Sequence, residues 1–127
     1  IFTAAHAWSV VEIIGTNAFA EWFHRLDDTD ASAVARCVDT LETMGEALGH
    51  PLSSAIKGSK YAIRELRVQS GGRPLRVLYA FDPERQAVLL IGGDKTGDKR
   101  FYERLVPIAE GLWEGYLAER ARGEKGG

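Results

Sequence analysis

The sequence predicts a single α+β domain: an N-terminal strand and a hairpin of two helices packed on an antiparallel sheet, followed by a C-terminal helix. Two observations predict this fold. Apolar residues repeat at three- and four-residue steps before Gly49, the period of amphipathic helices, and the period changes to two in three stretches after Pro51. A chain of 127 residues with 45% hydrophobic and 27% charged residues is also large enough for one core. We expect residues 1–121 to form the domain and residues 122–127 to form a flexible tail.

The first half of the chain predicts one strand and two helices. Residues 8–14 (WSVVEII) are rich in β-branched and aromatic side chains, which predicts a strand. Residues 17–26 predict a short helix capped by its first residue, an asparagine, because the apolar residues that follow have helical spacing. Residues 28–48 predict a longer amphipathic helix that Gly49 and Pro51 end.

The second half predicts three strands in an antiparallel meander. Residues 62–69 and 75–81 alternate between apolar and polar side chains, and the turn between them is short and rich in glycine. The turn at residues 82–85 contains aspartate and proline and leads to a fourth strand, residues 87–91. Because short turns join neighbouring antiparallel strands, we expect these three strands side by side.

A loop and a helix complete the predicted fold. Residues 92–97 (GGDKTG) contain three glycines, which predicts a loop. Residues 99–121 have apolar side chains at helical spacing. Pro107 lies within this stretch and lacks a backbone donor, so we expect either a kink there or a helix that starts near Arg104.

The strongest functional signal is a reversal of charge between Lys57 and Arg76. This stretch holds six Lys and Arg residues and one acid, Glu65, so its net charge is 6 − 1 = +5, whereas the rest of the chain carries 10 − 17 = −7. Clustered Arg and Lys bind phosphates and nucleic acids, and the local cluster matters more here than the net charge of −2. We therefore favour contact with phosphate or nucleic acid over the plainer alternative, a solvated surface.

Strand alternation brings two of these arginines together. Arg67 and Glu65 share one face of the second predicted strand, and Arg76 lies on the same face of the third. The apolar residues of both strands are expected to pack on the helical hairpin, so the arginines project from the free face. We expect no histidine or carboxylate to neutralise the cations gathered there. The further cations come from neighbouring turns and loops: Lys57, Lys60, Arg73, Lys95 and Lys99.

Four motifs, in order, resemble a known family. They are Lys57-Gly58, residues 63–67 (IRELR), residues 76–79 (RVLY) and residues 89–96 (LLIGGDKT). Together with the order of the predicted elements, these motifs are similar to the RelE/HigB superfamily of toxin–antitoxin toxins over residues 8–117. They are most similar to its phage-derived HigB-like branch. The resemblance implies a RelE-like fold.

The resemblance also implies an activity. Toxins of this superfamily are small endoribonucleases that cut mRNA without a metal or cofactor, usually on the ribosome, and so inhibit translation. The 2′-hydroxyl attacks the adjacent phosphate and leaves a cyclic phosphate and a 5′-hydroxyl. The implied partners are mRNA, the ribosome and a cognate antitoxin with a helix-turn-helix DNA-binding domain.

By position, the resemblance assigns residues to this reaction. Arg67 and Arg76 match the strand arginines that bind the scissile phosphate. Lys57 matches the basic residue ahead of the second predicted strand and is expected to act as a base or to hold the RNA backbone. Lys95 matches the lysine of the loop after the fourth strand. The residues expected to bind RNA are Lys60, Arg64, Arg73 and Lys99.

Some assignments stay open at this point. The general acid and base are not identified, and Tyr102 and Tyr116 are candidates by residue type only. A non-catalytic module of the same fold that binds RNA or an antitoxin is the alternative function. Cys37 is the only cysteine, which excludes an internal disulfide and fits the cytoplasm, and no apolar run is long enough to span a membrane.

Overall fold

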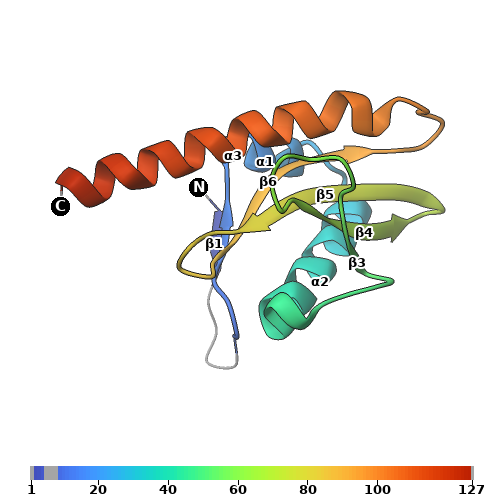
Figure 1. The fold of residues 1–127 in the computed structure, drawn as a ribbon. Helices are drawn as coiled ribbons and strands as arrows, with labels where there is room; N and C mark the ends of the chain where they lie inside the picture. Colours follow the sequence, from blue (N-terminus) through green and yellow to red (C-terminus); the bar gives the residue numbers. More distant parts are fainter. Residues whose placement is uncertain (1, 5–8, 127) are drawn as a thin grey trace.

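A six-stranded β-sheet lies at the centre of the computed structural model, which describes residues 2–4 and 9–126 (Figure 1). The strand order is β1-β2-β6-β5-β4-β3. Neighbouring strands are antiparallel except β2 and β6, which are parallel, so the sheet is mixed where an antiparallel sheet was predicted. The elements are β1 (Phe2–Ala4), β2 (Ile13–Gly15), α1 (Asn17–His24), α2 (Asp28–Met44), the 3-10 helix η1 (Gly45–Ala47), β3 (Ser53–Ala55), β4 (Arg64–Ser70), β5 (Arg73–Phe81), β6 (Ala87–Asp94) and α3 (Phe101–Gly126).

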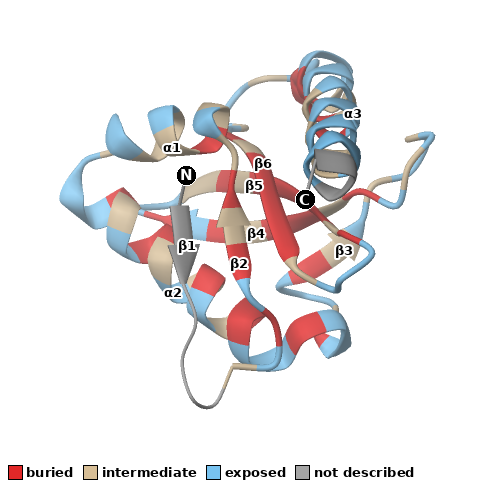
Figure 2. Cartoon of the chain, turned by 90° about the vertical axis from the view of Figure 1, so that its left-hand side faces the viewer, coloured by how far each residue is buried: buried red, intermediate tan, exposed pale blue. Residues whose placement is uncertain are grey.

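Two hydrophobic cores flank the sheet, as the α+β prediction requires. The helical hairpin α1–α2 packs on one face, against residues such as Leu66 and Val77. Helix α3 packs on the other face, where Leu78 and Leu90 meet Leu105. Figure 2 shows buried residues along the strands, between the hairpin and α3. The sheet face that was expected to be free is therefore partly covered by α3. None of the described helices is long and apolar enough to cross a membrane.

The helix starts follow local capping. The Thr16 side chain accepts a hydrogen bond from the Phe19 amide at 3.0 Å, so Thr16, and not Asn17, caps α1. The Asp27 side chain likewise accepts a hydrogen bond from the Asp30 amide at 2.8 Å and caps α2. Both residues are favoured N-caps because their oxygens satisfy amides that have no partner within the helix.

The strand predicted at residues 8–14 is observed as β2 and is shorter than predicted. Residues 13–15 pair with β6, whereas the amides of Val10 and Val11 donate to the Glu42 carbonyl at 2.9 and 3.3 Å. The end of α2 therefore satisfies the backbone that would otherwise extend the strand. Trp8, where the strand was predicted to begin, lies outside the described residues.

The predicted loop at residues 92–97 is wrong for its first three residues, because β6 continues to Asp94. A Cβ at Gly92 would lie 2.3 Å from the ring of Trp22, and one at Gly93 would lie 2.9 Å from the ring of Phe101. The glycines are thus required by helices that approach β6 closely from its two sides, and not by a turn.

The final helix begins at Phe101, so the alternative start near Arg104 is wrong. The helix contains Pro107 and continues beyond it. Phe101, Leu105 and Ala109 are buried against the sheet, and this packing compensates for the backbone hydrogen bond that proline cannot make. The helix runs to Gly126, so its backbone includes most of the segment expected to be a tail.

Substitution of Gly92 by alanine tests the close approach of α1 to β6. The new methyl group would collide with Trp22, so we expect Gly92→Ala to lower the free energy of unfolding by about 1–3 kcal/mol in urea denaturation. Gly115→Ala is the control: nothing lies within 4 Å of a Cβ at this helical position, and alanine there should stabilise the protein by about 1 kcal/mol. Equal stability of the two variants would contradict the close packing.

A buried aspartate is expected to make stability depend on pH. Asp30 of α2 accepts hydrogen bonds from Ser70, at 2.6 Å, and from Arg73, and these bonds lower the pKa of Asp30. A lowered pKa stabilises the fold above the pKa of an unfolded aspartate, about 3.9, and this contribution disappears as the pH falls through the folded-state value. Asp30→Asn should therefore melt at a lower temperature than the wild type at neutral pH.

The difference between the wild type and Asp30→Asn should shrink as the pH falls below about 4 and disappear below the folded-state pKa of Asp30, where both proteins lack the charge. Thermal melts at several pH values measure it. Asp39→Asn, at an exposed site on the same helix, should follow the wild type at every pH. A constant gap between Asp30→Asn and the wild type would show that the carboxylate charge is not what stabilises this contact.

Candidate functional site

Arg67 and Arg76 face each other across the β4–β5 ribbon. They are direct partners in the strand register, as are Leu66 and Val77 next to them. Leu66 and Val77 are buried against the helical hairpin, so both arginines project from the opposite face, as the alternation predicted. The Arg67 side chain is 39% exposed and the Arg76 side chain 11% exposed.

A carboxylate lies between the two arginines. The Glu65 side chain is only 6% exposed, with Oε1 3.3 Å from Nε of Arg76 and Oε2 3.8 Å from Nε of Arg67. The expectation that no carboxylate would neutralise this face is therefore wrong. The contacts are ion pairs without hydrogen-bond geometry, because both Nε atoms are buried and lack a hydrogen-bond partner among the described residues. Glu65 thus balances part of the positive charge and fixes where the guanidiniums lie.

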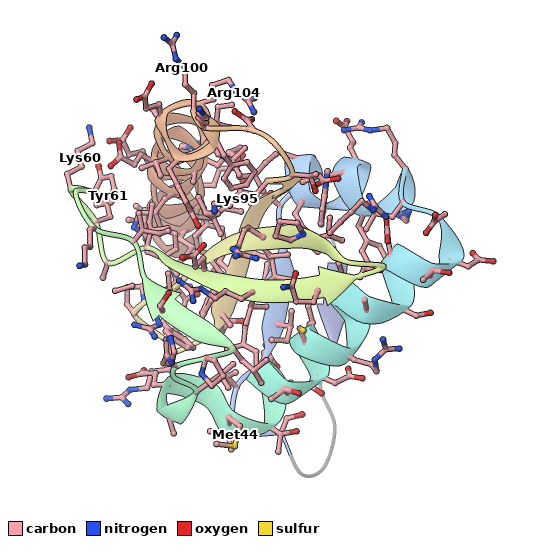
Figure 3. All side chains as sticks on the ribbon, turned by 90° about the vertical axis from the view of Figure 1, so that its right-hand side faces the viewer. Met44, Lys60, Tyr61, Lys95, Arg100 and Arg104 are labelled. Carbon is pink, nitrogen blue, oxygen red and sulfur yellow. The ribbon has the colours of Figure 1, made fainter. Side chains whose placement is uncertain are left out.

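Tyr102, in the first turn of α3, completes this contact. Its hydroxyl donates to Glu65 Oε1 at 2.6 Å, and Ser54 of β3 donates to Oε2 at 3.3 Å. Burial, together with the hydrogen bond to Glu65, raises the pKa of Tyr102. The ammonium of Lys95 lies 5.7 Å from the centre of the Tyr102 ring, a cation–π contact. Figure 3 shows Lys95 between α3 and the β5 strand.

We call these residues the Glu65 cluster: Ser54, Glu65, Arg67, Arg76, Lys95 and Tyr102. They come from β3, β4, β5, α3 and the loop before α3, and their formal charge is 3 − 1 = +2 with Tyr102 neutral. Guanidiniums on adjacent strands suit oriented, bidentate contact with a phosphate. A phenol with a raised pKa remains protonated and can donate a proton.

Two predicted RNA-binding arginines lie outside the cluster. Arg64 has the same strand parity as Leu66, so it projects from the hairpin face, where its Nε donates to Ser53 Oγ at 3.1 Å. Arg73 is paired with Asp30 and, at 3.1 Å, with Asp94. Their contacts are structural: Arg64 ties β4 to β3, and Arg73 ties the β4–β5 turn to α2 and β6.

The predicted lysines are placed in three ways. Lys95 belongs to the Glu65 cluster, whereas Lys99 is exposed in the turn before α3. Lys57 is exposed in the loop between β3 and β4. Lys60, in the same loop, forms an ion pair of 3.3 Å with Glu114 of α3, and this contact raises the pKa of Lys60.

The second tyrosine candidate, Tyr116, lies elsewhere. Its hydroxyl donates to Oδ2 of the buried Asp82 at 2.7 Å, and burial together with this bond raises the pKa of Tyr116 to about 12. Asp82 also accepts bonds from the amides of Glu84 and Gln86, so Tyr116 fastens α3 to the β5–β6 turn. A cavity of about 640 Å³ lies between this part of α3 and the start of α1, and no residue of the Glu65 cluster lines it.

Sequence reasoning named Tyr102 by residue type only and did not find the role of Glu65. Strand parity was the available signal, because it places Glu65 on the face of Arg67 and Arg76. Tyr102 has no local signal, since only the packing of α3 brings it to the sheet. Within the described ranges, no group of three or more His, Cys, Asp or Glu side chains is arranged to hold a metal ion.

Comparison with known proteins identifies the family of the chain. Residues 21–114 match the family described as "Phage derived protein Gp49-like (DUF891)". The chain is 40% identical over 104 residues to the candidate toxin HigB3 of Mycobacterium tuberculosis (strain ATCC 25618 / H37Rv), which covers 80% of this chain and 90% of that protein. It is 37% identical over 101 residues to the candidate toxin HigB2 of the same strain, with coverages of 77% and 50%.

The chain therefore spans about half the length of HigB2 but nearly all of HigB3. No solved structure matches it. The family match covers α2, the whole β3–β6 region and the part of α3 that carries Tyr102. The chain thus belongs to the phage-derived Gp49-like family and is a HigB-like protein, as its motifs indicated.

Proposed function

We propose that this protein is the toxin of a toxin–antitoxin system and that it acts as a metal-independent mRNA endoribonuclease that inhibits translation. The relatives named as HigB toxins support the first part. One observation supports the second: Arg67 and Arg76 converge on Glu65 beside the Tyr102 hydroxyl. This arrangement provides two oriented cations and a proton donor at one place on a rigid sheet.

The reaction has modest requirements. The 2′-hydroxyl gives its proton to water and attacks the adjacent phosphorus, the bond to the 5′-oxygen breaks, and that oxygen takes up a proton. The products are a 2′,3′-cyclic phosphate and a 5′-hydroxyl. Negative charge grows on the phosphate oxygens in the transition state, so fixed cations that contact these oxygens accelerate the reaction.

The Glu65 cluster has groups for two of these tasks, the charge on the phosphate and proton donation to the 5′-oxygen. Arg67 and Arg76 bind the scissile phosphate, and Glu65 holds their Nε atoms in place. The Tyr102 phenol donates the proton to the 5′-oxygen, since its raised pKa keeps it protonated at neutral pH. Lys95 lies over the ring of Tyr102 and adds positive charge beside the bound RNA.

A non-catalytic module that binds RNA or an antitoxin is the second candidate. The ion pairs of Glu65 favour this binding module, because they neutralise part of the positive charge of Arg67 and Arg76 that catalysis would use. The product distinguishes the two: a cyclic phosphate after incubation with RNA or with programmed ribosomes identifies the nuclease. Salt-dependent RNA binding without cleavage identifies the binding module. Under the first function the partners are mRNA on the ribosome and a cognate helix-turn-helix antitoxin in the cytoplasm.

Removal of either arginine should abolish cleavage. We expect Arg67→Ala and Arg76→Ala each to lower the cleavage rate about 100-fold or more, because each removes charge from the transition state. Arg76→Lys should also be impaired, since an ammonium keeps the charge but loses the planar fork. Arg36→Ala, at an exposed site on α2, changes the net charge equally and should cleave like the wild type. Wild-type cleavage rates in both Arg67→Ala and Arg76→Ala would refute the proposed site.

The role of Tyr102 predicts a specific kinetic signature. Tyr102→Phe should lower kcat about tenfold to 100-fold with little change in KM, because the proton donor is lost while Arg67 and Arg76 remain to bind the phosphate. The wild-type rate should not fall on the alkaline side until the pH passes the ordinary tyrosine value of about 10, since the pKa of Tyr102 is raised. Unchanged kcat in Tyr102→Phe would exclude this tyrosine as the proton donor.

A further inference from the structure

The loop between β3 and β4, residues 56–63, is fastened to a helix that is distant in sequence. The Ser59 hydroxyl donates to Glu110 Oε2 of α3 at 2.8 Å, and the Lys60 amide donates to the same oxygen at 3.0 Å. One carboxylate thus holds two successive residues of the loop. Figure 3 shows Lys60 and Tyr61 on this loop, on the α3 side of the sheet.

A second carboxylate, one helical turn further along α3, holds the next part of the loop. Glu114 accepts a hydrogen bond from the Tyr61 hydroxyl and forms the ion pair of 3.3 Å with the Lys60 ammonium. These contacts lower the pKa of Glu114, and the bond to Glu114 raises the pKa of Tyr61. Because Glu110 and Glu114 are four residues apart, they lie on one face of the helix.

Hydrogen bonds between the residues that flank the strands restrain the loop only at its base. The Ile56 amide donates to the Ile63 carbonyl at 2.9 Å, and within the loop the Tyr61 amide donates to Ser59 Oγ at 3.2 Å. In the part of the chain that the structure describes, the other hydrogen bonds and ion pairs of residues 57–62 all go to Glu110 or Glu114. The position of the loop therefore depends on α3.

The same contacts give Lys60 a role other than the one predicted. A lone exposed ion pair contributes little to stability, and the side chains of Lys60 and Glu114 are 63% and 48% exposed. Here, however, four contacts from three successive residues converge on two carboxylates, so the loop is held as a unit. Lys60 is occupied in this network. Lys57 of the same loop forms no ion pair with the described residues and remains free to contact a ligand.

Helix α3 also relates this loop to the Glu65 cluster. Tyr102 is in the first turn of α3, and Glu110 and Glu114 follow it by eight and twelve residues. At a rise of 1.5 Å per residue, the loop is anchored about 12–18 Å along the helix from Tyr102. Lys57 comes two residues before Ser59, the first residue of the loop that α3 anchors, so the anchor also limits where the Lys57 ammonium can reach.

We propose that Glu110 and Glu114 are positioning residues, a carboxylate latch on α3 that fixes the β3–β4 loop so that Lys57 binds the RNA backbone beside the cleaved linkage. The proposal rests on the proposed nuclease function for its RNA contact. The contacts of Glu110 and Glu114 with the loop are present in the protein without RNA, so they can be tested without RNA. Loss of the latch should therefore weaken the binding of RNA that is long enough to reach Lys57, and leave the chemical step unchanged.

The first test measures the loop without RNA. Amide hydrogen exchange of residues 57–62 should become at least about tenfold faster in Glu110→Ala/Glu114→Ala, while exchange in the sheet stays unchanged. The control is Glu103→Ala/Glu119→Ala: it removes the same two charges from exposed sites on α3 and should exchange like the wild type. Unchanged loop exchange in the latch variant would overturn the latch, whatever the protein's activity.

The second test separates KM from kcat. With a hexanucleotide, the latch variant should raise KM about tenfold with kcat within about twofold, as Lys57→Ala should, and adding Lys57→Ala to the latch variant should cause no further loss. With a dinucleotide, which has no flanking phosphate for Lys57 to bind, all these proteins should behave alike. The control variant should show an equal or lower KM, because loss of two negative charges reduces the repulsion of RNA.

The outcomes are distinct. A faster-exchanging loop with unchanged hexanucleotide KM would overturn the positioning role of the latch. Additive losses from Lys57→Ala and the latch variant would show that the latch acts through something other than Lys57. If the wild type cleaves no RNA, the proposed function and the kinetic part fail together, and the exchange measurement still decides whether the latch holds the loop.

Discussion

The carboxylate of Glu65 is the contact on which the arrangement of this protein depends. A buried carboxylate is costly unless it is paired and hydrogen-bonded, and here its partners come from β3, β4, β5 and α3. Burial of Glu65 therefore requires that α3 lie against the β4–β5 ribbon with Tyr102 over the sheet. The same requirement draws Arg67 and Arg76 together. One buried charge thus couples the packing of the fold to the placement of the cations.

Helix α3 extends this coupling along its length. Its first turn supplies Tyr102 to the Glu65 cluster, and its middle supplies Glu110 and Glu114 to the β3–β4 loop. Further along, Tyr116 fastens it to the β5–β6 turn through Asp82. Because an α-helix is stiff over such distances, it sets the spacing between Tyr102 and the part of the loop that Glu110 and Glu114 hold. The cations that contact RNA in our proposal are therefore positioned by carboxylates and phenols of neighbouring elements, and Tyr102 has both a positioning and a proton-donating role.

Strand periodicity predicted the parts of this site that depend on local sequence. It placed Arg67 and Arg76 on one face, and the same parity places Arg64 with Leu66 on the other face, away from this pair. Strand periodicity could not predict the ion-pair partners of Arg73 and Lys60. Asp30 and Glu114 are distant in sequence, and no local pattern indicates that they would capture these cations. Gly92 and Gly93 misled for a related reason, since glycine serves both turns and close packing.

The central claim is that Arg67 and Arg76 together hold one RNA phosphate above Glu65. Titration of the protein with an RNA oligonucleotide that carries a 2′-O-methyl group, and so cannot react, tests it in 15N-resolved NMR spectra of the arginine Nε–H groups. The account predicts that the Arg67 and Arg76 signals move together with one dissociation constant, and that the Arg36 signal does not move. RNA binding that leaves both signals in place would contradict it.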